Sequence, residues 1–132
     1  MPVLVDSNVV LYIVNDDLVW ADWSDGQMTR LQPTGLLVNP MIYAELCAGS
    51  ETASEVDGIL DQLKLEYQEL SREALFLAAK AFLKYRKQGG TKTAALPDFF
   101  IGAHAAVLGI PILTRDPGRY KTYFPGVPLI CP

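Results

Sequence analysis

Four acidic residues stand where an apolar chain does not usually carry a charge. They are Asp6, Glu45, Asp98 and Asp116. Asp6 and Asp116 each end a largely apolar run, Glu45 lies inside one, and Asp98 opens a segment with a helical pattern. A carboxylate removed from water needs a partner, and the same segments carry no matching buried cation. The four acids therefore indicate a metal site and make the chain a candidate metal-dependent enzyme.

Three of these acids also have a local structural explanation. Asp6 is a suitable N-cap for a following helix, and Asp98 suits the first turn of one. Asp116 precedes Pro117 and is a natural turn residue. Glu45 neither caps a helix nor forms a turn. These readings stay open for each residue alone, but the set of four favours the metal site.

Length and composition indicate one folded domain, residues 1–132, with half of its residues apolar. We find no targeting segment and no apolar run near the roughly 20 residues of a membrane span. Cys47 and Cys131 fit neither a CxxC motif nor a disulfide framework, which favours buried thiols in a reducing cytoplasm. The net charge of −4 argues against broad adhesion to nucleic acid or membrane but allows a local basic patch.

Strand and helix patterns alternate along the chain, which places it in the α/β class with an open parallel sheet covered by helices. The expected strands are Val3–Val5, Leu36–Val38, Leu65–Leu70, Ile110–Leu113 and Val127–Ile130. The expected helices are Ser7–Val14, one starting at Asn39-Pro40, Ala53–Leu63, one from Ser71 to about Lys87, and Pro97–Leu108. Ser7 or Asn8 is the expected cap of the first helix.

This architecture brings the acids together. Parallel strands end at one edge, so Asp6 and Asp116 should emerge there, and neighbouring strands lie roughly 4.8 Å apart. Two carboxylates on adjacent strands can then share one cation. Gly102 and Ala105 lie on the same helical face as Asp98, and we expect their small size to leave room for a metal and a phosphate.

Several other residues have less certain roles. His104 is the single histidine, and its position on the helix favours packing; a Ser-His-Asp mechanism has no support. Trp20, Trp23 and Leu31 suggest an amphipathic helix between the first two strands. The two tryptophans suit either the core or an interface with a partner.

Basic residues fall into two clusters that suit phosphate groups. Lys84 and Lys87 belong to a stripe on the long helix, and Arg115 and Arg119 flank the last acid. All four are candidate substrate-binding residues. A solvated helix face explains the lysines equally well, and ordinary salt bridges are open for the arginines.

Four segments together resemble the acidic motifs of PIN-domain ribonucleases. They are Val5–Val10, Ala44–Leu46, Asp98–Ala105 and Leu113–Asp116. The compact length, the order of the motifs and the Arg-Asp-Pro ending look most like VapC-type toxins of prokaryotic toxin–antitoxin pairs. The resemblance spans nearly the whole chain.

This resemblance implies an α/β/α sandwich with a parallel sheet of about five strands, and an acidic pocket for Mg²⁺ or Mn²⁺. Its ligands and catalytic residues would be Asp6, Glu45, Asp98 and Asp116, with Ser7, Asn8 and Thr114 in support. It also implies a cognate antitoxin, a homodimer and an RNA substrate, with tRNA favoured over mRNA.

The sequence thus predicts a cytoplasmic endoribonuclease that hydrolyses phosphodiester bonds with a metal-activated water. One alternative is a phosphatase or phosphotransferase that uses Asp6 as its nucleophile. Haloacid dehalogenase-like phosphatases carry a second acid two residues later, and this chain has Asn8 there. The other alternative is a non-catalytic interaction module that binds a structural ion.

Overall fold

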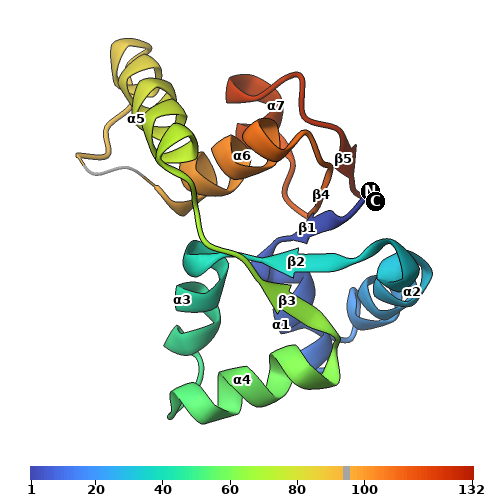
Figure 1. The fold of residues 1–132 in the computed structure, drawn as a ribbon. Coiled ribbons are helices and arrows are strands. Elements are labelled where there is room, and N and C mark those ends of the chain that lie inside the picture. The colour runs from blue at the N-terminus through green and yellow to red at the C-terminus, as the bar shows by residue number, and fades with distance from the viewer. Residues whose placement is uncertain (94–95) are drawn as a thin grey trace.

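The computed structural model describes residues 1–93 and 96–132 and contains one five-stranded, all-parallel sheet (Figure 1). The strand order is β3-β2-β1-β4-β5. The strands are β1 (Val3–Val5), β2 (Leu36–Val38), β3 (Leu65–Tyr67), β4 (Ile112–Leu113) and β5 (Leu129–Ile130). The predicted α/β class and parallel sheet are confirmed.

Helices connect consecutive strands and cover both faces of the sheet (Figure 1). On one face lie α1 (Ser7–Val14), α2 (Ala21–Leu31), the short 3₁₀ helix η1 (Gln32–Thr34), α3 (Pro40–Ala48) and α4 (Ala53–Gln62). On the other lie α5 (Arg72–Lys87), α6 (Pro97–Leu108) and α7 (Gly118–Tyr123). This division follows from right-handed crossovers, because the chain moves toward β3 first and toward β5 later.

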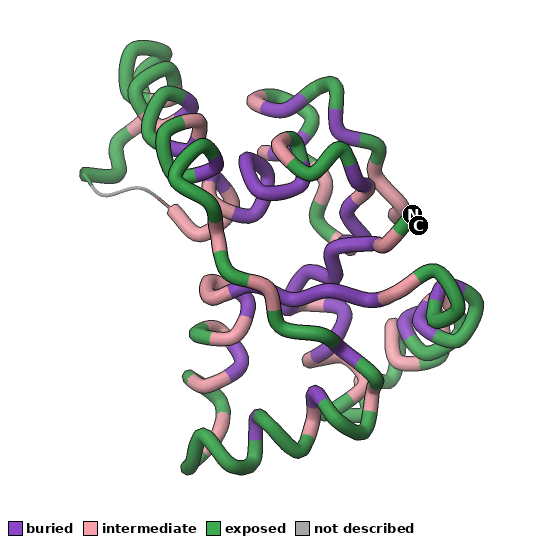
Figure 2. The backbone as a smooth tube through the Cα atoms, in the orientation of Figure 1, coloured by how far each residue is buried: buried purple, intermediate pink, exposed green. Residues whose placement is uncertain are grey.

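The first strand lies at the centre of the sheet and is buried on both faces. Leu4 is fully buried and is in register with Leu37 on β2 and with Ile112 on β4. Figure 2 shows that buried backbone gathers in these strands and on the inner sides of the helices. The strand order reverses between β1 and β4, and ligands of such sheets bind beyond the carboxyl ends of the strands at that point.

Three strands are shorter than predicted. Pairing of β4 and β5 begins after Pro111 and Pro128, which have no N–H to donate. The edge strand β3 ends at Tyr67, although Gln68 N still donates to Val38 O at 2.9 Å. The prediction through Leu70 was therefore too long.

The helix boundaries follow local capping chemistry. Asn39 and Ser71 cap α3 and α5 as predicted, accepting from backbone N–H groups at 3.0 and 3.1 Å. Gly109 ends α6 with a left-handed φ of 67°, which favours glycine. Asp6 caps α1, which confirms the local structural explanation given for this acid, whereas the expectation that Ser7 or Asn8 is the cap was wrong.

In the described residues, no helix is both long enough and apolar enough to cross a membrane.

Candidate functional site

The four predicted acids lie around the carboxyl end of the sheet. Asp6 directly follows β1, and Asp116 lies just beyond the adjacent parallel strand β4. Glu45 comes from the middle of α3, and Asp98 from the first turn of α6. These elements, distant in sequence, meet where the strand order reverses.

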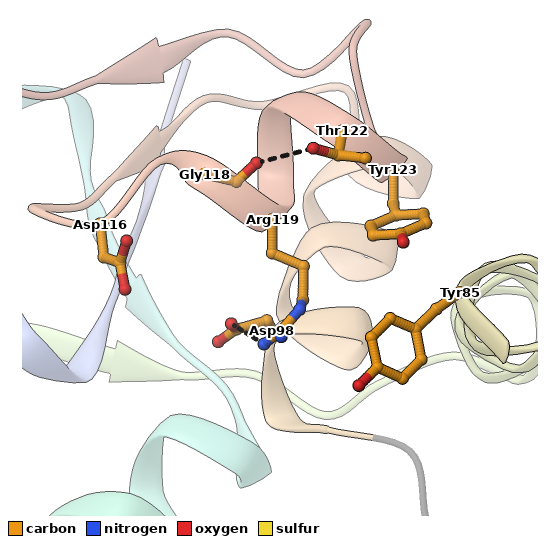
Figure 3. A pocket seen from close by; sticks show the side chains of 7 residues that line it. All are labelled: Tyr85, Asp98, Asp116, Gly118, Arg119, Thr122 and Tyr123. Carbon is orange, nitrogen blue, oxygen red and sulfur yellow. Dashed lines mark hydrogen bonds and ion pairs between the residues drawn. The ribbon is translucent and has the colours of Figure 1, made fainter. Parts of the chain in front are cut away.

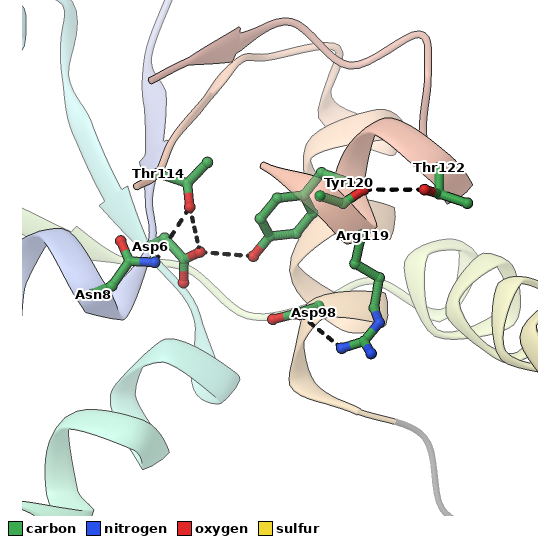
Figure 4. Close-up of polar contacts among 8 residues, drawn as sticks. Asp6, Asn8, Asp98, Thr114, Arg119, Tyr120 and Thr122 are labelled. Carbon is green, nitrogen blue, oxygen red and sulfur yellow. Dashed lines mark hydrogen bonds and ion pairs between the residues drawn. The ribbon is translucent and has the colours of Figure 1, made fainter. Parts of the chain in front are cut away.

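Asp6 is buried and held by three hydrogen bonds, and Figure 4 shows those from Thr114 and Tyr120. Its Oδ1 accepts from the backbone N of Ser7 at 2.8 Å. Its Oδ2 accepts from Thr114 Oγ1 and from the Tyr120 hydroxyl, both at 2.9 Å. Thr114 and Tyr120 are also buried, so the carboxylate has a fixed position and orientation.

Asn8 and Thr114 fasten the turn after β4 to the start of α1. Asn8 Nδ2 donates to Thr114 Oγ1 at 3.4 Å, and Arg115 N donates to Asn8 Oδ1 at 3.2 Å. Asp116 N donates to Thr114 Oγ1 at 3.0 Å. We call Asp6, Asn8, Thr114 and Tyr120 the strand-end network. The supporting positions expected for Asn8 and Thr114 agree with these contacts.

Asp98 has a cationic partner that the sequence pattern did not reveal. Arg119 Nη1 donates to Asp98 Oδ2 at 3.2 Å, and the two side chains are 34% and 35% exposed. The same guanidinium lies over the rings of Tyr85 and Phe99, 5.6 and 5.8 Å from their centroids. Arg119 therefore reaches the acidic site from α7, but its contact in this structure is an ion pair with Asp98.

Burial raises the pKa of three of the acids, Asp6, Glu45 and Asp98. It raises the pKa of Asp6, and the bonds from Tyr120 and Thr114 offset part of that effect. Burial likewise raises the pKa of Glu45, and the nearby charges of Asp6 and Asp98 raise it further. The pKa of Asp98 is raised by burial and partly lowered by Arg119. Mutual repulsion of this kind is relieved by a bound cation.

The donor chemistry fits a divalent cation that prefers oxygen ligands. Among the described residues, Glu45 Oε1 is buried without a hydrogen-bond partner, and Asp6 Oδ1 accepts a single bond. Within residues 1–93 and 96–132, however, no three acidic, histidine or cysteine side chains already stand together as a metal-binding group. Asp98 would have to exchange Arg119 for the ion. The four carboxylates thus suit Mg²⁺ or Mn²⁺ but are not closed around one.

A cavity of about 340 Å³ opens beside this acidic edge (Figure 3). Its lining residues are Tyr85, Asp98, Asp116, Gly118, Arg119, Thr122 and Tyr123. Asp6 and Glu45 lie outside it. Of the predicted substrate-binding residues, Arg119 borders the cavity, whereas Lys84 and Lys87 are exposed on α5 and do not.

Arg115 lies over the ring of Trp20, 4.2 Å from its centroid, and its buried Nε has no hydrogen-bond partner within residues 1–93 and 96–132. Trp20 and Trp23 are half-buried and meet edge to face, with centroids 6.2 Å apart. Trp23 packs against the core. The predicted helix between the first two strands is α2.

The expectation that small residues leave space for a metal beside Asp98 was wrong for Gly102. A Cβ on Gly102 would lie 2.3 Å from the Phe124 ring, so the missing side chain makes room for that ring. Ala105 is fully buried.

The packing role of His104 is confirmed. It is buried, and Asn39 Nδ2 donates to its Nδ1 at 3.1 Å, because Asn39 Oδ1 already accepts from Ile42 N.

The sequence prediction missed α7 and, with it, Tyr120. A six-residue helix that starts at Gly118 is too short to form from intrinsic propensity. Tertiary contacts of the buried Tyr120 and Phe124 stabilise it. The one signal in the sequence that pointed to Tyr120 was its position four residues after Asp116, close to an acid of the predicted site.

Comparisons with known proteins agree with this arrangement. Residues 3–125 match the PIN domain family. No curated protein is a significant sequence match. Among solved structures, VapBC2 from Rickettsia felis, bound to a promoter DNA fragment, gives a TM-score of 0.76 at 19% identity, covering 99% of this chain and 98% of the matched one.

VapBC-1 from nontypeable Haemophilus influenzae gives a TM-score of 0.74 at 18% identity, covering 99% of this chain and 98% of the matched one. FitAcB from Neisseria gonorrhoeae gives a TM-score of 0.68 at 18% identity, covering 98% of this chain and 96% of the matched one. The fold is therefore shared with chains of VapBC and FitAB complexes over almost its full length. Because the family match extends over most of the sequence, the chain belongs to the PIN domain family.

Proposed function

We propose that this chain is a metal-dependent endoribonuclease and the toxin of a VapBC-type toxin–antitoxin pair. The observation that carries the proposal is the meeting of Asp6, Glu45 and Asp98, with Asp116 beside them, at the strand-order reversal of a PIN domain. The fold shared with VapBC and FitAB chains supports the toxin assignment.

In this proposal the carboxylates hold Mg²⁺ or Mn²⁺, with Asp6 and Asp98 as direct ligands. A divalent ion in such a site supplies an activated water and neutralises charge on the phosphoryl oxygens. The strand-end network fixes the Asp6 carboxylate. Glu45 contributes a buried oxygen that has no hydrogen-bond partner in the part of the chain that the structure describes. The ion pair between Arg119 and Asp98 breaks when Asp98 binds the ion, and Arg119 can then contact the substrate phosphate.

The contacts of Asp6 disfavour the alternative in which it is a covalent nucleophile. A nucleophilic oxygen needs free access to a phosphorus atom, whereas Asp6 is buried and Oδ2 accepts two hydrogen bonds. Trapping a phosphoaspartate on Asp6 would nevertheless favour a phosphatase. Failure to cleave RNA would favour a non-catalytic ion-binding module.

The partners follow from the resemblance to VapC-type toxins. We propose a cognate antitoxin, a homodimer, a cytoplasmic location and an RNA substrate, with tRNA ahead of mRNA. Sequencing the 5′ ends of cellular RNAs after brief expression would identify the RNA and the bond. A small reading frame directly upstream of the gene would support the toxin assignment.

The direct test is cleavage of labelled RNA by antitoxin-free protein with Mn²⁺ and with EDTA. Asp6→Asn and Asp98→Asn should each lower the cleavage rate by more than about 100-fold, because both remove a proposed ligand. Asp61→Asn, an exposed acid on α4, is the matched control and should cleave normally. Equal cleavage by all four proteins would refute the site, and cleavage in EDTA would refute the metal requirement.

A further inference from the structure

The cavity beside the acids combines aromatic rings, a cation and carboxylates (Figure 3). It lies between α5, which supplies Tyr85, and α7, which supplies Arg119 and Tyr123. Asp98 and Asp116 border it on the side of the proposed metal site. A ligand in this cavity would therefore touch the rings and the acidic edge together.

The aromatic side of the cavity is built to hold its rings in place. The ring centroids of Tyr85 and Tyr123 are 6.2 Å apart, and both rings pack on buried Phe99 at 5.5 and 5.3 Å. A Cβ on Gly90 would lie 2.4 Å from the Tyr85 ring, so the glycine permits this ring position. Lys92 N also donates to the Tyr85 hydroxyl at 3.3 Å. The rings of Tyr85 and Tyr123 are therefore held in place before any ligand binds.

The charged side of the cavity can bind a phosphate. In Figure 3 the Arg119 side chain extends from α7 to Asp98, with the two tyrosines on its other side. Its contact with Asp98 is a single 3.2 Å bond at a partly exposed position, where ion pairs are weak. A guanidinium binds phosphate through paired N–H groups. Arg119 can thus exchange the carboxylate for a phosphate.

We propose that this cavity binds one unpaired nucleotide of the substrate next to the bond that is cut. The base packs against Tyr85 and Tyr123, and its phosphate contacts Arg119. Aromatic stacking accepts any base, so the subsite selects single-stranded or looped RNA rather than a sequence. The cavity volume of about 340 Å³ falls within the usual range for small-molecule sites. This inference rests on the proposed ribonuclease function.

The test compares adenosine monophosphate with ribose 5-phosphate, which has the same charged group and sugar but no base. Binding to the full chain in EDTA is followed by NMR chemical shifts. The nucleotide should bind more tightly by a factor of about 5 to 150, the usual contribution of one stacked base. Tyr123→Leu should remove this difference, whereas Tyr123→Phe should keep it. Arg119→Gln should weaken both ligands alike.

Three results would overturn the subsite. The first is equal affinity of the wild type for the two ligands, and the second is an unchanged difference in a folded Tyr85→Leu/Tyr123→Leu variant. The third is binding of neither ligand. The assay involves no cleavage. Base-dependent binding by a protein that never cuts RNA would therefore refute the proposed function and retain the subsite.

Discussion

The two sides of the site are built in opposite ways. The strand-end network, in which Asp6, Thr114 and Tyr120 are buried and Asn8 is half-buried, is joined by several hydrogen bonds. Its residues come from the ends of β1 and β4, from α1 and from α7. The other side, which we call the rim, consists of Asp98, Arg119, Tyr85 and Tyr123. Its polar contacts are the partly exposed ion pair between Asp98 and Arg119 and the hydrogen bond from Lys92 N to the Tyr85 hydroxyl, and its rings border an open cavity.

This difference in burial means that the strand-end network holds its side chains in fixed positions, whereas the rim can exchange one contact for another. Breaking a buried hydrogen bond leaves a partner unsatisfied, so Asp6 has no alternative arrangement of similar energy. A partly exposed ion pair costs little to break, so Arg119 can change partners. The strand-end network therefore suits a residue that must hold a ligand at a fixed point. The rim suits a surface that must admit one.

Apart from replacing the proposed ligands themselves, the largest effect on activity is expected inside the strand-end network. Thr114→Val removes the donor to Asp6 and the acceptor of Asp116 N, and Tyr120→Phe removes the other side-chain donor. Each should lower Mn²⁺ affinity or cleavage rate by about 10- to 100-fold, as losses of ligand-orienting partners do. Calorimetric Mn²⁺ binding and an RNA cleavage assay would measure this. Thr29→Val, exposed on α2, is the control, and equal values for all variants would contradict the positioning role.

The next effect concerns the helix that carries Asp98. Gly102→Ala should destabilise the fold by about 1–3 kcal/mol, because its Cβ would overlap the Phe124 ring. Gly58→Ala in α4 has no atom within 4 Å of the new Cβ and should instead stabilise by about 0.5–1 kcal/mol. Urea unfolding measures both. A harmless Gly102→Ala would restore the idea that this position leaves space for a ligand.

The sequence predicted the rigid side of this comparison better than the rim. Asp6 and Asp116 end apolar strands, and parallel strands have one shared carboxyl edge, so their convergence follows from local patterns. Glu45 was identified because no local role explained it. Tyr120 and the contact of Arg119 with Asp98 depend on α7, whose existence depends on tertiary packing. Gly102 was misread because its neighbour Phe124 is 22 residues away, and spacing along one helix cannot show it.

The burial of the acids should also appear in the pH dependence of stability. Folding raises the pKa of Asp6 and Glu45 above 3.8 and 4.5, so the folded state binds more protons than the unfolded state. Their contribution to stability is then full below these values and is lost as pH rises through the folded pKa. The unfolding free energy of Asp6→Asn should therefore fall less than that of the wild type between about pH 4 and pH 8, because the variant lacks this carboxyl group.

The control for that experiment is Asp61→Asn, which is exposed and should leave the slope unchanged. Adding Mn²⁺ to the wild type should reduce the loss at neutral pH, since a cation stabilises the ionised acids. A slope that Asp6→Asn leaves intact would show that the buried carboxylate ionises as easily in the folded chain as in the unfolded one.

The smallest effect on folding is expected at the rim. Arg119→Gln breaks the ion pair with Asp98, yet it should change the unfolding free energy by less than about 1 kcal/mol, because both side chains are about a third exposed. The same change should tighten Mn²⁺ binding, since Arg119 competes with the ion for Asp98. The positive charge of Arg119 also offsets part of the negative charge of the site. Arg30→Gln, on α2, where the exposed Arg30 Nη2 donates to Gln27 Oε1, is the matched control for the lost charge. Weaker Mn²⁺ binding in Arg119→Gln alone would mean that Arg119 orients Asp98 for the metal, and the rim would then belong to the positioning half of the site.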